Sequence, residues 1–67
     1  MQAKVDNRVQ ELRRKKKITQ QDLAHSVGVT RQTIIAIEKG NYVPSVGLAI
    51  RISQFFNKHV DEIFILQ

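Results

Sequence analysis

Residues 20–37, which read QQDLAHSVGVTRQTIIAI, constrain the fold more than any other part of the chain. Their pattern predicts two short helices joined by a tight turn. Gly28 is expected to end the first helix, because glycine adopts a positive φ without steric cost. Thr19 and Thr30 are expected to cap the two helices, since a threonine hydroxyl accepts hydrogen bonds from the free N–H groups of the first turn. Asp22, three residues after Thr19, completes a capping-box pattern.

The apolar residues of this stretch indicate which helix faces point inward. Leu23, Ala24 and Val27 share one face of the first helix, at the spacing of a buried stripe. The inner face of the turn and of the second helix is expected to contain Val29, Ile34 and Ile37. Ala24 precedes Gly28 by four residues, where a small side chain lets two crossing helices approach each other.

Four linked positions carry a family resemblance: Ala24, Gly28 four residues later, and Ile34 and Ile37 six and nine residues after the glycine. This spacing resembles the helix-turn-helix of phage repressors. The wider string ITQQDLAHSVGVTRQTIIAIEKGNYVPS is similar to the Cro/C1-type (Xre) family of bacterial and phage transcriptional regulators. The resemblance covers about residues 6–64. It implies an all-α fold, a compact five-helix lambda-repressor-like DNA-binding domain.

Three further helices are expected outside the central pair. The first is predicted from Asp6, as its cap, to about Lys16, with Val5, Val9 and Leu12 on its inner face. The next is expected over about residues 46–56, between a Ser45 cap and Asn57, which can adopt the αL conformation that ends a helix. The last is expected over residues 60–64, after His59.

An apolar run at the end of the chain needs to be covered in a folded domain. The run consists of Ile63, Phe64, Ile65 and Leu66. One possible cover is a short strand that pairs with residues 2–5, and the other is a second copy of the protein; both can occur together. The sequence therefore predicts a possible terminal β pairing, and residues 63–67 are expected to take part in a dimer contact.

Basic residues are concentrated in the first part of the chain. The net charge is +5, and six cations lie within ten residues, namely Arg8, Arg13, Arg14, Lys15, Lys16 and Lys17. Such a patch favours a polyanionic partner. The alternative is a solvated helix end, because cations are favourable near helix C-termini. Beside a helix-turn-helix pattern, nucleic acid is the favoured partner.

Several other function classes find no support in the sequence. Its 67 residues fit one domain, residues 1–67. There is no cysteine, and His25 and His59 lie far apart, so no metal or cofactor is expected. No apolar run approaches the roughly 18 residues of a membrane span, and the first residues lack an apolar signal core. No acid/base pair or activated nucleophile is present, so neither an enzyme nor a small-molecule ligand is predicted. The expected location is the cytoplasm, at the nucleoid.

The second helix of a helix-turn-helix enters the major groove of DNA. Its outward, base-contacting side chains are predicted to be Arg31, Gln32, Ile35 and Ala36. Arg31 can pair with the two acceptors of guanine, and Gln32 with the acceptor and donor of adenine. Ile35 and Ala36 offer apolar surface to thymine methyl groups. The alternatives are a solvated polar face for the first two residues and peripheral packing for Ile35.

A second set of residues is predicted to contact phosphate, which positions a protein without reading sequence. These residues are Gln20, Gln21, Thr30, Thr33, Lys39, Asn41 and Tyr42. The two glutamines begin the first helix of the pair, where the positive helix end favours a phosphate. The threonines offer hydroxyl groups, and the last three residues are assigned from the family resemblance. Tyr42 has an alternative interpretation as an aromatic residue at the core edge.

The resemblance also implies a structural ion pair. The family pairs an arginine of its first helix with the glutamate that ends its third, and the matching residues here are Arg13 and Glu38. A bidentate bridge between them would tie the first helix to the recognition helix. It would also neutralise an anion that lies close to the DNA.

Together these features predict a small DNA-binding regulator, a repressor or an activator with the repressor favoured, that binds an inverted-repeat operator as a homodimer. The second hypothesis is a protein-interaction module of the same fold, such as an antitoxin or anti-activator. That module would use the apolar tail and Ile35 as its contact surface.

Overall fold

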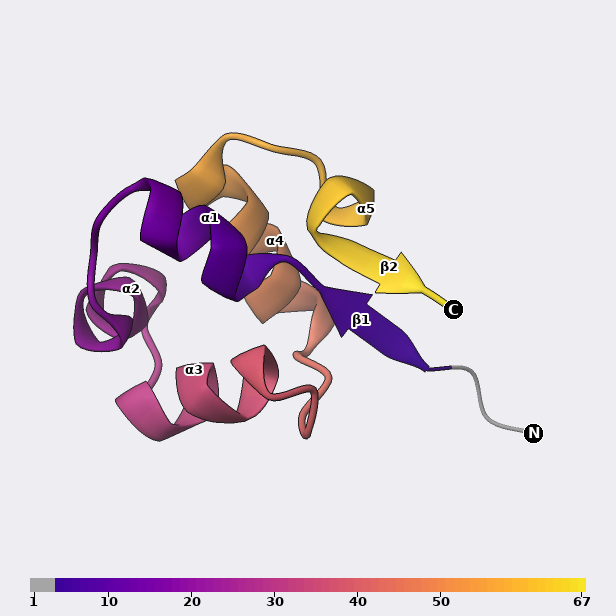
Figure 1. The fold of residues 1–67 in the computed structure, drawn as a ribbon, viewed down its shortest axis with the longest axis horizontal. Coiled ribbons are helices and arrows are strands. Elements are labelled where there is room, and N and C mark those ends of the chain that lie inside the picture. Colours follow the sequence, from indigo (N-terminus) through magenta and orange to yellow (C-terminus); the bar gives the residue numbers. More distant parts are fainter. Residues whose placement is uncertain (1–3) are drawn as a thin grey trace.

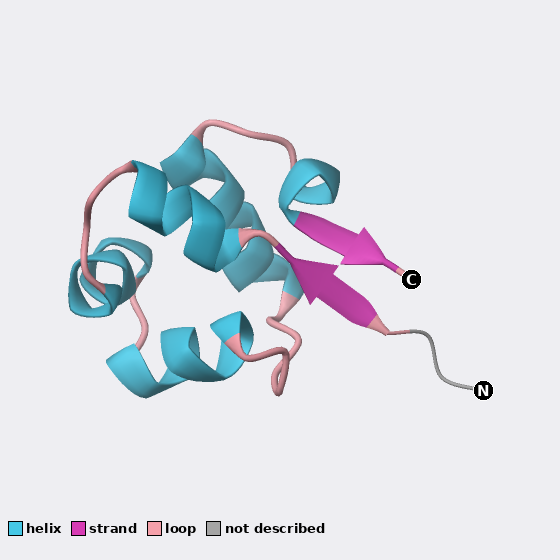
Figure 2. Ribbon diagram, viewed as in Figure 1, coloured by secondary structure: helices cyan, strands magenta, loops and turns pink. Residues whose placement is uncertain are grey.

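The computed structural model describes residues 4–67, which form five helices and a two-stranded sheet (Figure 1). In chain order the elements are β1 (Val5–Asn7), α1 (Val9–Lys15), α2 (Gln20–Val27), α3 (Arg31–Glu38), α4 (Val46–Phe56), α5 (Val60–Ile63) and β2 (Phe64–Leu66). The two strands lie together at one end of the molecule, and α2 lies at the opposite end (Figure 2). The helical architecture confirms the predicted fold class, including the short β pairing.

One hydrophobic core joins all five helices. Its buried members are Val9, Leu12, Leu23, Ala24, Val27, Ile34, Ile37, Leu48, Ile52, Phe56 and Ile63. Burying a large apolar side chain stabilises a fold by about 1.5–3 kcal/mol, so the core holds even helices that are weak alone. This applies to α3, whose β-branched residues lower its intrinsic helix propensity. Among the described helices, none has the length and apolar character of a membrane-spanning segment.

The start of α2 is fixed by the expected capping box. The Thr19 hydroxyl accepts from the Asp22 N–H at 3.0 Å, and the Asp22 carboxylate accepts from the Thr19 N–H at 3.1 Å. The hydrogen bond from the Thr19 backbone lowers the pKa of Asp22. Thr30 caps α3 in the expected way, since its hydroxyl accepts from the Thr33 N–H at 3.3 Å. The first turns of both predicted helices are therefore fixed by local hydrogen bonds.

Gly28 ends α2 in the left-handed conformation, with φ of 77° and ψ of 35°. Its N–H donates to the His25 carbonyl at 3.3 Å, and the next N–H, of Val29, donates to the Ala24 carbonyl at 3.0 Å. The left-handed conformation of Gly28 ends α2 and turns the chain, and so it sets the direction in which the chain continues into α3. The predicted tight turn is confirmed.

Gly28→Ala is expected to lower the free energy of unfolding by about 1–2 kcal/mol, the cost of a left-handed conformation for an L-residue. A Cβ added at Gly28 would meet no heavy atom of the surrounding residues within 4 Å, so the cost comes from the local backbone conformation and not from a clash with the rest of the protein. Urea denaturation of the variant measures it. An equally stable Gly28→Ala protein would contradict this account of the turn.

The helix over residues 46–56 has the predicted bounds and ends. The Ser45 hydroxyl accepts from the Leu48 N–H at 3.2 Å, and Asn57 has a φ of 54° in the αL region. The last helix is shorter than predicted. It ends at Ile63, because Phe64 is extended and begins β2.

The prediction that the first helix begins after Asp6 is wrong. Asp6 lies in β1, opposite Ile65, and α1 begins at Val9. The N-cap residue of α1 is Arg8, which makes no side-chain capping bond. The side-chain oxygen of Asn7, one residue earlier, accepts from the Val9 N–H at 3.1 Å. Residues 5–7 are extended because their backbone groups pair with the C-terminal strand.

The strand expected over residues 2–5 is displaced towards the C-terminus. β1 pairs antiparallel with β2 in the register Val5 to Leu66 and Asn7 to Phe64. The pairing continues outward, since the Gln67 N–H donates to the Lys4 carbonyl at 2.7 Å. Residues 1–3 lie outside the described residues, so the pairing of residues 2 and 3 is untested.

Candidate nucleic-acid interface

The third helix turns one face to the core and the other to solvent. Ile34 and Ile37 are fully buried, which fixes the rotation of α3 about its own axis. The opposite face is formed by the predicted base-contacting residues, Arg31, Gln32, Ile35 and Ala36. Arg31 and Gln32 are exposed, whereas Ile35 and Ala36 are half-buried. We call these four residues the reading face.

Two surface hollows lie against the N-terminal half of α3. The larger, of about 670 Å³, is the α2 hollow, lined by Arg13, Lys17, Ile18, Thr19, Gln20, Gln21 and Arg31. The smaller, of about 290 Å³, is the α3 hollow, lined by Thr30, Gln32, Thr33, Ala36 and Tyr42. The two hollows share no lining residue, and each includes part of the reading face. No group of three potential metal ligands occurs among residues 4–67.

Five of the seven predicted phosphate-contacting residues line one of these two hollows. Gln20 and Gln21 line the α2 hollow, and Thr30, Thr33 and Tyr42 line the α3 hollow. Tyr42 is 45% exposed and is not part of the core cluster. The remaining two, Lys39 and Asn41, line neither hollow; they follow the end of α3 and are exposed.

Some of these polar groups already have partners within the protein. The amide nitrogen of Gln20 donates to Glu38 Oε1 at 3.0 Å. The hydroxyl oxygens of Thr30 and Thr33 lie 3.1 Å apart and share a hydrogen bond. Neither contact could be predicted from the sequence, because each depends on side-chain geometry. These bonds hold the polar groups in place at the edge of the reading face.

Arg13 and Glu38 form a bidentate ion pair that links α1 to the end of α3. Arg13 Nε donates to Glu38 Oε2 at 2.7 Å, and Arg13 Nη2 donates to Glu38 Oε1 at 3.2 Å. The side chains are 11% and 2% exposed, so the pair is largely desolvated. A third nitrogen, Arg13 Nη1, donates to the Ile18 carbonyl at 2.9 Å. The guanidinium therefore joins α1, the chain before α2, and α3.

Two residues without a predicted role also fix the helix pair. Asn7 Nδ2 donates to the Ile37 carbonyl at 2.8 Å, which ties β1 to the C-terminal turn of α3. Arg51 Nε donates to the Val27 carbonyl at 3.0 Å, which ties α4 to the end of α2. An asparagine just before a helix is a recognisable cap signal. The contacts across 30 and 24 residues have no such local signal.

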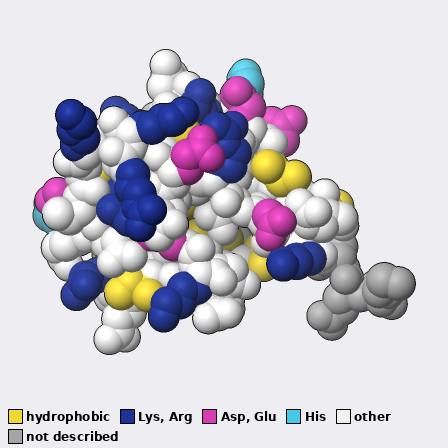
Figure 3. Space-filling model, viewed as in Figure 1, with side chains coloured by type: hydrophobic (Ala, Val, Ile, Leu, Met, Phe, Trp, Pro, Cys, Tyr) yellow, Lys and Arg dark blue, Asp and Glu magenta, His cyan; other side chains and the backbone are white. Residues whose placement is uncertain are grey.

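The basic side chains are unevenly distributed over the surface. In the view of Figure 3, Lys and Arg side chains gather over α1 and along α3, and acidic side chains lie among them over α1 and towards α5 and β1. Part of the basic run is neutralised within α1, since Arg8 Nη2 donates to Glu11 Oε2 at 2.6 Å. That hydrogen bond lowers the pKa of Glu11. The net charge of +5 and the cations that line the α2 hollow favour an anionic ligand.

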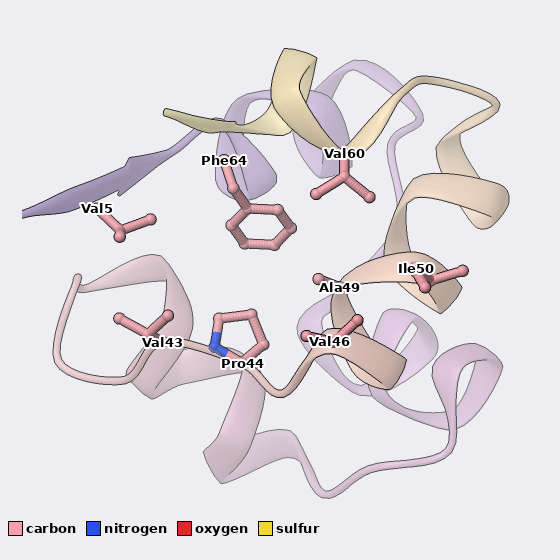
Figure 4. A pocket seen from close by; sticks show the side chains of 8 residues that line it. All are labelled: Val5, Val43, Pro44, Val46, Ala49, Ile50, Val60 and Phe64. Atoms are coloured by element: carbon pink, nitrogen blue, oxygen red, sulfur yellow. The ribbon is translucent and has the colours of Figure 1, made fainter. Parts of the chain in front are cut away.

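An apolar groove, lined by none of the reading-face residues, lies between the sheet, the loop after α3, α4 and α5 (Figure 4). Its volume is about 160 Å³, and it is lined by Val5, Val43, Pro44, Val46, Ala49, Ile50, Val60 and Phe64. Val43 and Val46 are 59% and 77% exposed on its rim. Exposed apolar surface of this kind is typical of a protein contact.

The tail residues do not share one role. Ile63, expected in an intersubunit contact, is fully buried within the core of its own chain, so that expectation is wrong. It is the last residue of α5, whose inner face packs on the other helices. Phe64 packs partly on the core and lines the groove. Ile65 and Leu66 are 40% and 70% exposed and remain available for contact.

The part of the chain that forms the five helices matches a known protein family. A family model described as helix-turn-helix matches residues 9–63, which include α1 through α5. The chain belongs to this family. The match confirms the resemblance to Cro/C1-type (Xre) regulators that the α2–α3 pattern predicts.

Similar proteins occur in distant organisms. An uncharacterized HTH-type transcriptional regulator of Methanocaldococcus jannaschii is 56% identical over 50 residues, covering 75% of this chain and 76% of its own. One from Bacillus subtilis is 48% identical over 61 residues, covering 91% and 92%. The crystal structure of a candidate DNA-binding protein from Bacteroides fragilis has a TM-score of 0.79 at 20% identity. It covers 90% of this chain and 97% of that one, and this likeness shows the fold.

Proposed function

We propose that this helix-turn-helix protein is a sequence-specific transcriptional regulator, a repressor that binds an inverted-repeat operator as a homodimer. One observation carries the proposal: Arg31 and Gln32 are exposed at the start of a helix whose opposite face is locked into the core. The names of its relatives, HTH-type transcriptional regulators, support it. Repression by occupying an operator needs no contact beyond DNA binding. The proposed place of action is the nucleoid.

The reading face has the donor and acceptor groups for base edges. The Arg31 guanidinium fits the O6 and N7 acceptors of guanine, and the Gln32 carboxamide fits the N6 and N7 groups of adenine. Ile35 and Ala36 are half-buried, so they offer a narrow apolar strip to thymine methyl groups. We assign base recognition to these four residues.

Phosphate contacts on either side would hold α3 in the groove. In this proposal one DNA strand runs along the α2 hollow and meets Gln20 and Gln21. The other runs along the α3 hollow and meets Thr30, Thr33 and Tyr42, with Lys39 and Asn41 beyond the end of the helix. The Thr30–Thr33 hydrogen bond leaves one of the two hydroxyls free to donate to a phosphate.

The dimer contact is assigned to the apolar groove together with Ile65 and Leu66. This surface contains exposed valines and an isoleucine and none of the reading-face residues, so a second copy can cover it while both third helices face DNA. A two-fold dimer would place those helices in successive major grooves, about 34 Å apart. A 67-residue chain buries a small core, which favours stabilisation by association.

Val46→Glu is expected to shift the protein from dimer to monomer, because a carboxylate would be buried in the contact. Val46 is 77% exposed at the first position of α4, where an acidic residue is favourable, so the fold should be unaffected. Sedimentation equilibrium gives the mass. Gln54→Glu, on an exposed position of the same helix outside the groove, is the matched control and should remain dimeric. A Val46→Glu protein as dimeric as the wild type would exclude this surface.

Selection of bound sequences from a random duplex pool tests the proposed function. The expected result is an enriched inverted repeat with half-sites one helical turn apart, about 34 Å. An enriched site without two-fold symmetry would contradict the homodimer. No enrichment at any salt concentration would contradict sequence-specific binding itself.

The apolar groove also favours a second candidate function, a protein-interaction module such as an antitoxin or anti-activator. The two candidates differ in their response to salt. A DNA-binding protein loses affinity for random duplex steeply between two salt concentrations, as counterions are released. A protein that binds only a partner protein would show no binding to random duplex at either salt concentration.

A further inference from the structure

The three consecutive lysines after α1 have different surroundings. Lys15 Nζ lies 3.7 Å from Glu11 Oε2, which partly neutralises it. Lys16 Nζ lies 5.4 Å from the centroid of the Phe55 ring, over an aromatic face. Of the three, Lys17 lines the α2 hollow. The basic run is therefore not a uniform patch, and its third residue belongs to the candidate DNA interface.

The backbone explains why Lys17 departs from the direction of α1. It has a φ of 58°, in the left-handed region. Its N–H donates to the Arg14 carbonyl at 3.0 Å, and the Ile18 N–H donates to the Arg13 carbonyl at 3.4 Å. These bonds close the helix and turn the chain towards α2. A lysine in this conformation is uncommon, because an L-residue with a Cβ disfavours it.

Of the cations that line the α2 hollow, Lys17 makes no salt bridge to another described residue and does not belong to the reading face. Arg13 lines the hollow but is paired with Glu38, so its charge is balanced. Arg31 belongs to the reading face. Gln20 and Gln21 contribute neutral amides. Lys17 is exposed and supplies a further positive charge at the lining of the hollow.

We propose that Lys17 contacts a DNA phosphate in the α2 hollow and positions the backbone next to α3. The proposal rests on the proposed function and adds a residue to it. A flexible ammonium group suits a phosphate as a point charge. Such a contact reads no sequence, so it should strengthen binding to every duplex equally.

Lys17→Gly separates this role from a structural one. Glycine favours the left-handed conformation of residue 17, so the variant should be at least as stable as the wild type in urea denaturation. Its affinity for random duplex and for the selected operator should fall by the same factor. The salt slope, which is the slope of the logarithm of the binding constant against the logarithm of the salt concentration, should decrease in magnitude by about 0.9. The loss of affinity between about 50 and about 200 mM salt should therefore be about 3.5-fold smaller than for the wild type.

Two matched variants complete the experiment. Lys17→Arg retains the charge and should restore both affinity and salt slope, and Lys15→Gln removes a charge that lies beside Glu11 and should change the slope less. If wild type binds DNA and Lys17→Gly changes the slope no more than Lys15→Gln, the role of Lys17 is overturned. If the wild type itself shows no salt-dependent binding, it is the proposed function that fails.

Discussion

Arg13→Ala is expected to lower the free energy of unfolding by about 3–5 kcal/mol, the usual cost of leaving one partner of a buried ion pair uncompensated. The Glu38 side chain is 2% exposed, so water cannot replace the guanidinium. The whole stability of a 67-residue chain is only about 3–10 kcal/mol. Urea denaturation should therefore show a protein close to unfolding, and α3 would lose its anchor to α1.

Two variants make this prediction specific. Arg14→Ala removes the adjacent exposed arginine and should change the stability little. Arg13→Met combined with Glu38→Leu removes both charges and should recover most of the loss, because a buried pair can be replaced by apolar residues of similar volume. If Arg13→Ala were as stable as Arg14→Ala, the bridge would not be holding the recognition helix.

Arg31→Ala is expected to lower discrimination at one base pair of each half-site by about 1–3 kcal/mol, or about 5- to 150-fold. The reason is that a bidentate arginine contact distinguishes guanine from the other bases in the major groove. The loss of discrimination is measured by competition: the selected operator competes with duplexes in which one base pair at a time is replaced. Gln21→Ala, in the α2 hollow, should instead weaken binding to all of these duplexes by a similar factor.

The assignment of roles depends on the difference between these two variants. Both side chains are exposed, so neither substitution should change the stability by more than a few tenths of a kcal/mol. If Arg31→Ala weakened binding to all duplexes equally, Arg31 would be a phosphate contact and the reading face would be misassigned.

The helix-turn-helix could be predicted from sequence because its signals are local. The Thr19 and Thr30 caps, Gly28 and the spacing of the apolar residues act within one or two helical turns. The same holds for Ser45 at the start of α4. The family resemblance added the Arg13–Glu38 pair, which no local pattern would have indicated. These elements place the reading face.

The sequence-based predictions were wrong where a local signal competes with a contact to a distant part of the chain. Asp6 is a good helix cap in isolation, but the pairing of residues 5–7 with β2 holds it in a strand. Ile63 belongs to an apolar tail in the sequence, yet α5 directs it into the core. The apolar groove combines side chains from three separate stretches of the chain, residue 5, residues 43–50 and residues 60–64, so no window of sequence could reveal it.

In the proposed complex α3 lies in the major groove, with Arg31 at a guanine. Methylation interference with dimethyl sulfate on the selected operator tests it directly, since the reagent marks guanine N7 in the major groove and adenine N3 in the minor groove. The predicted result is that methylation of one guanine in each half-site, at symmetric positions about 34 Å apart, blocks binding. Binding blocked by adenine methylation alone, with every guanine tolerated, would contradict it.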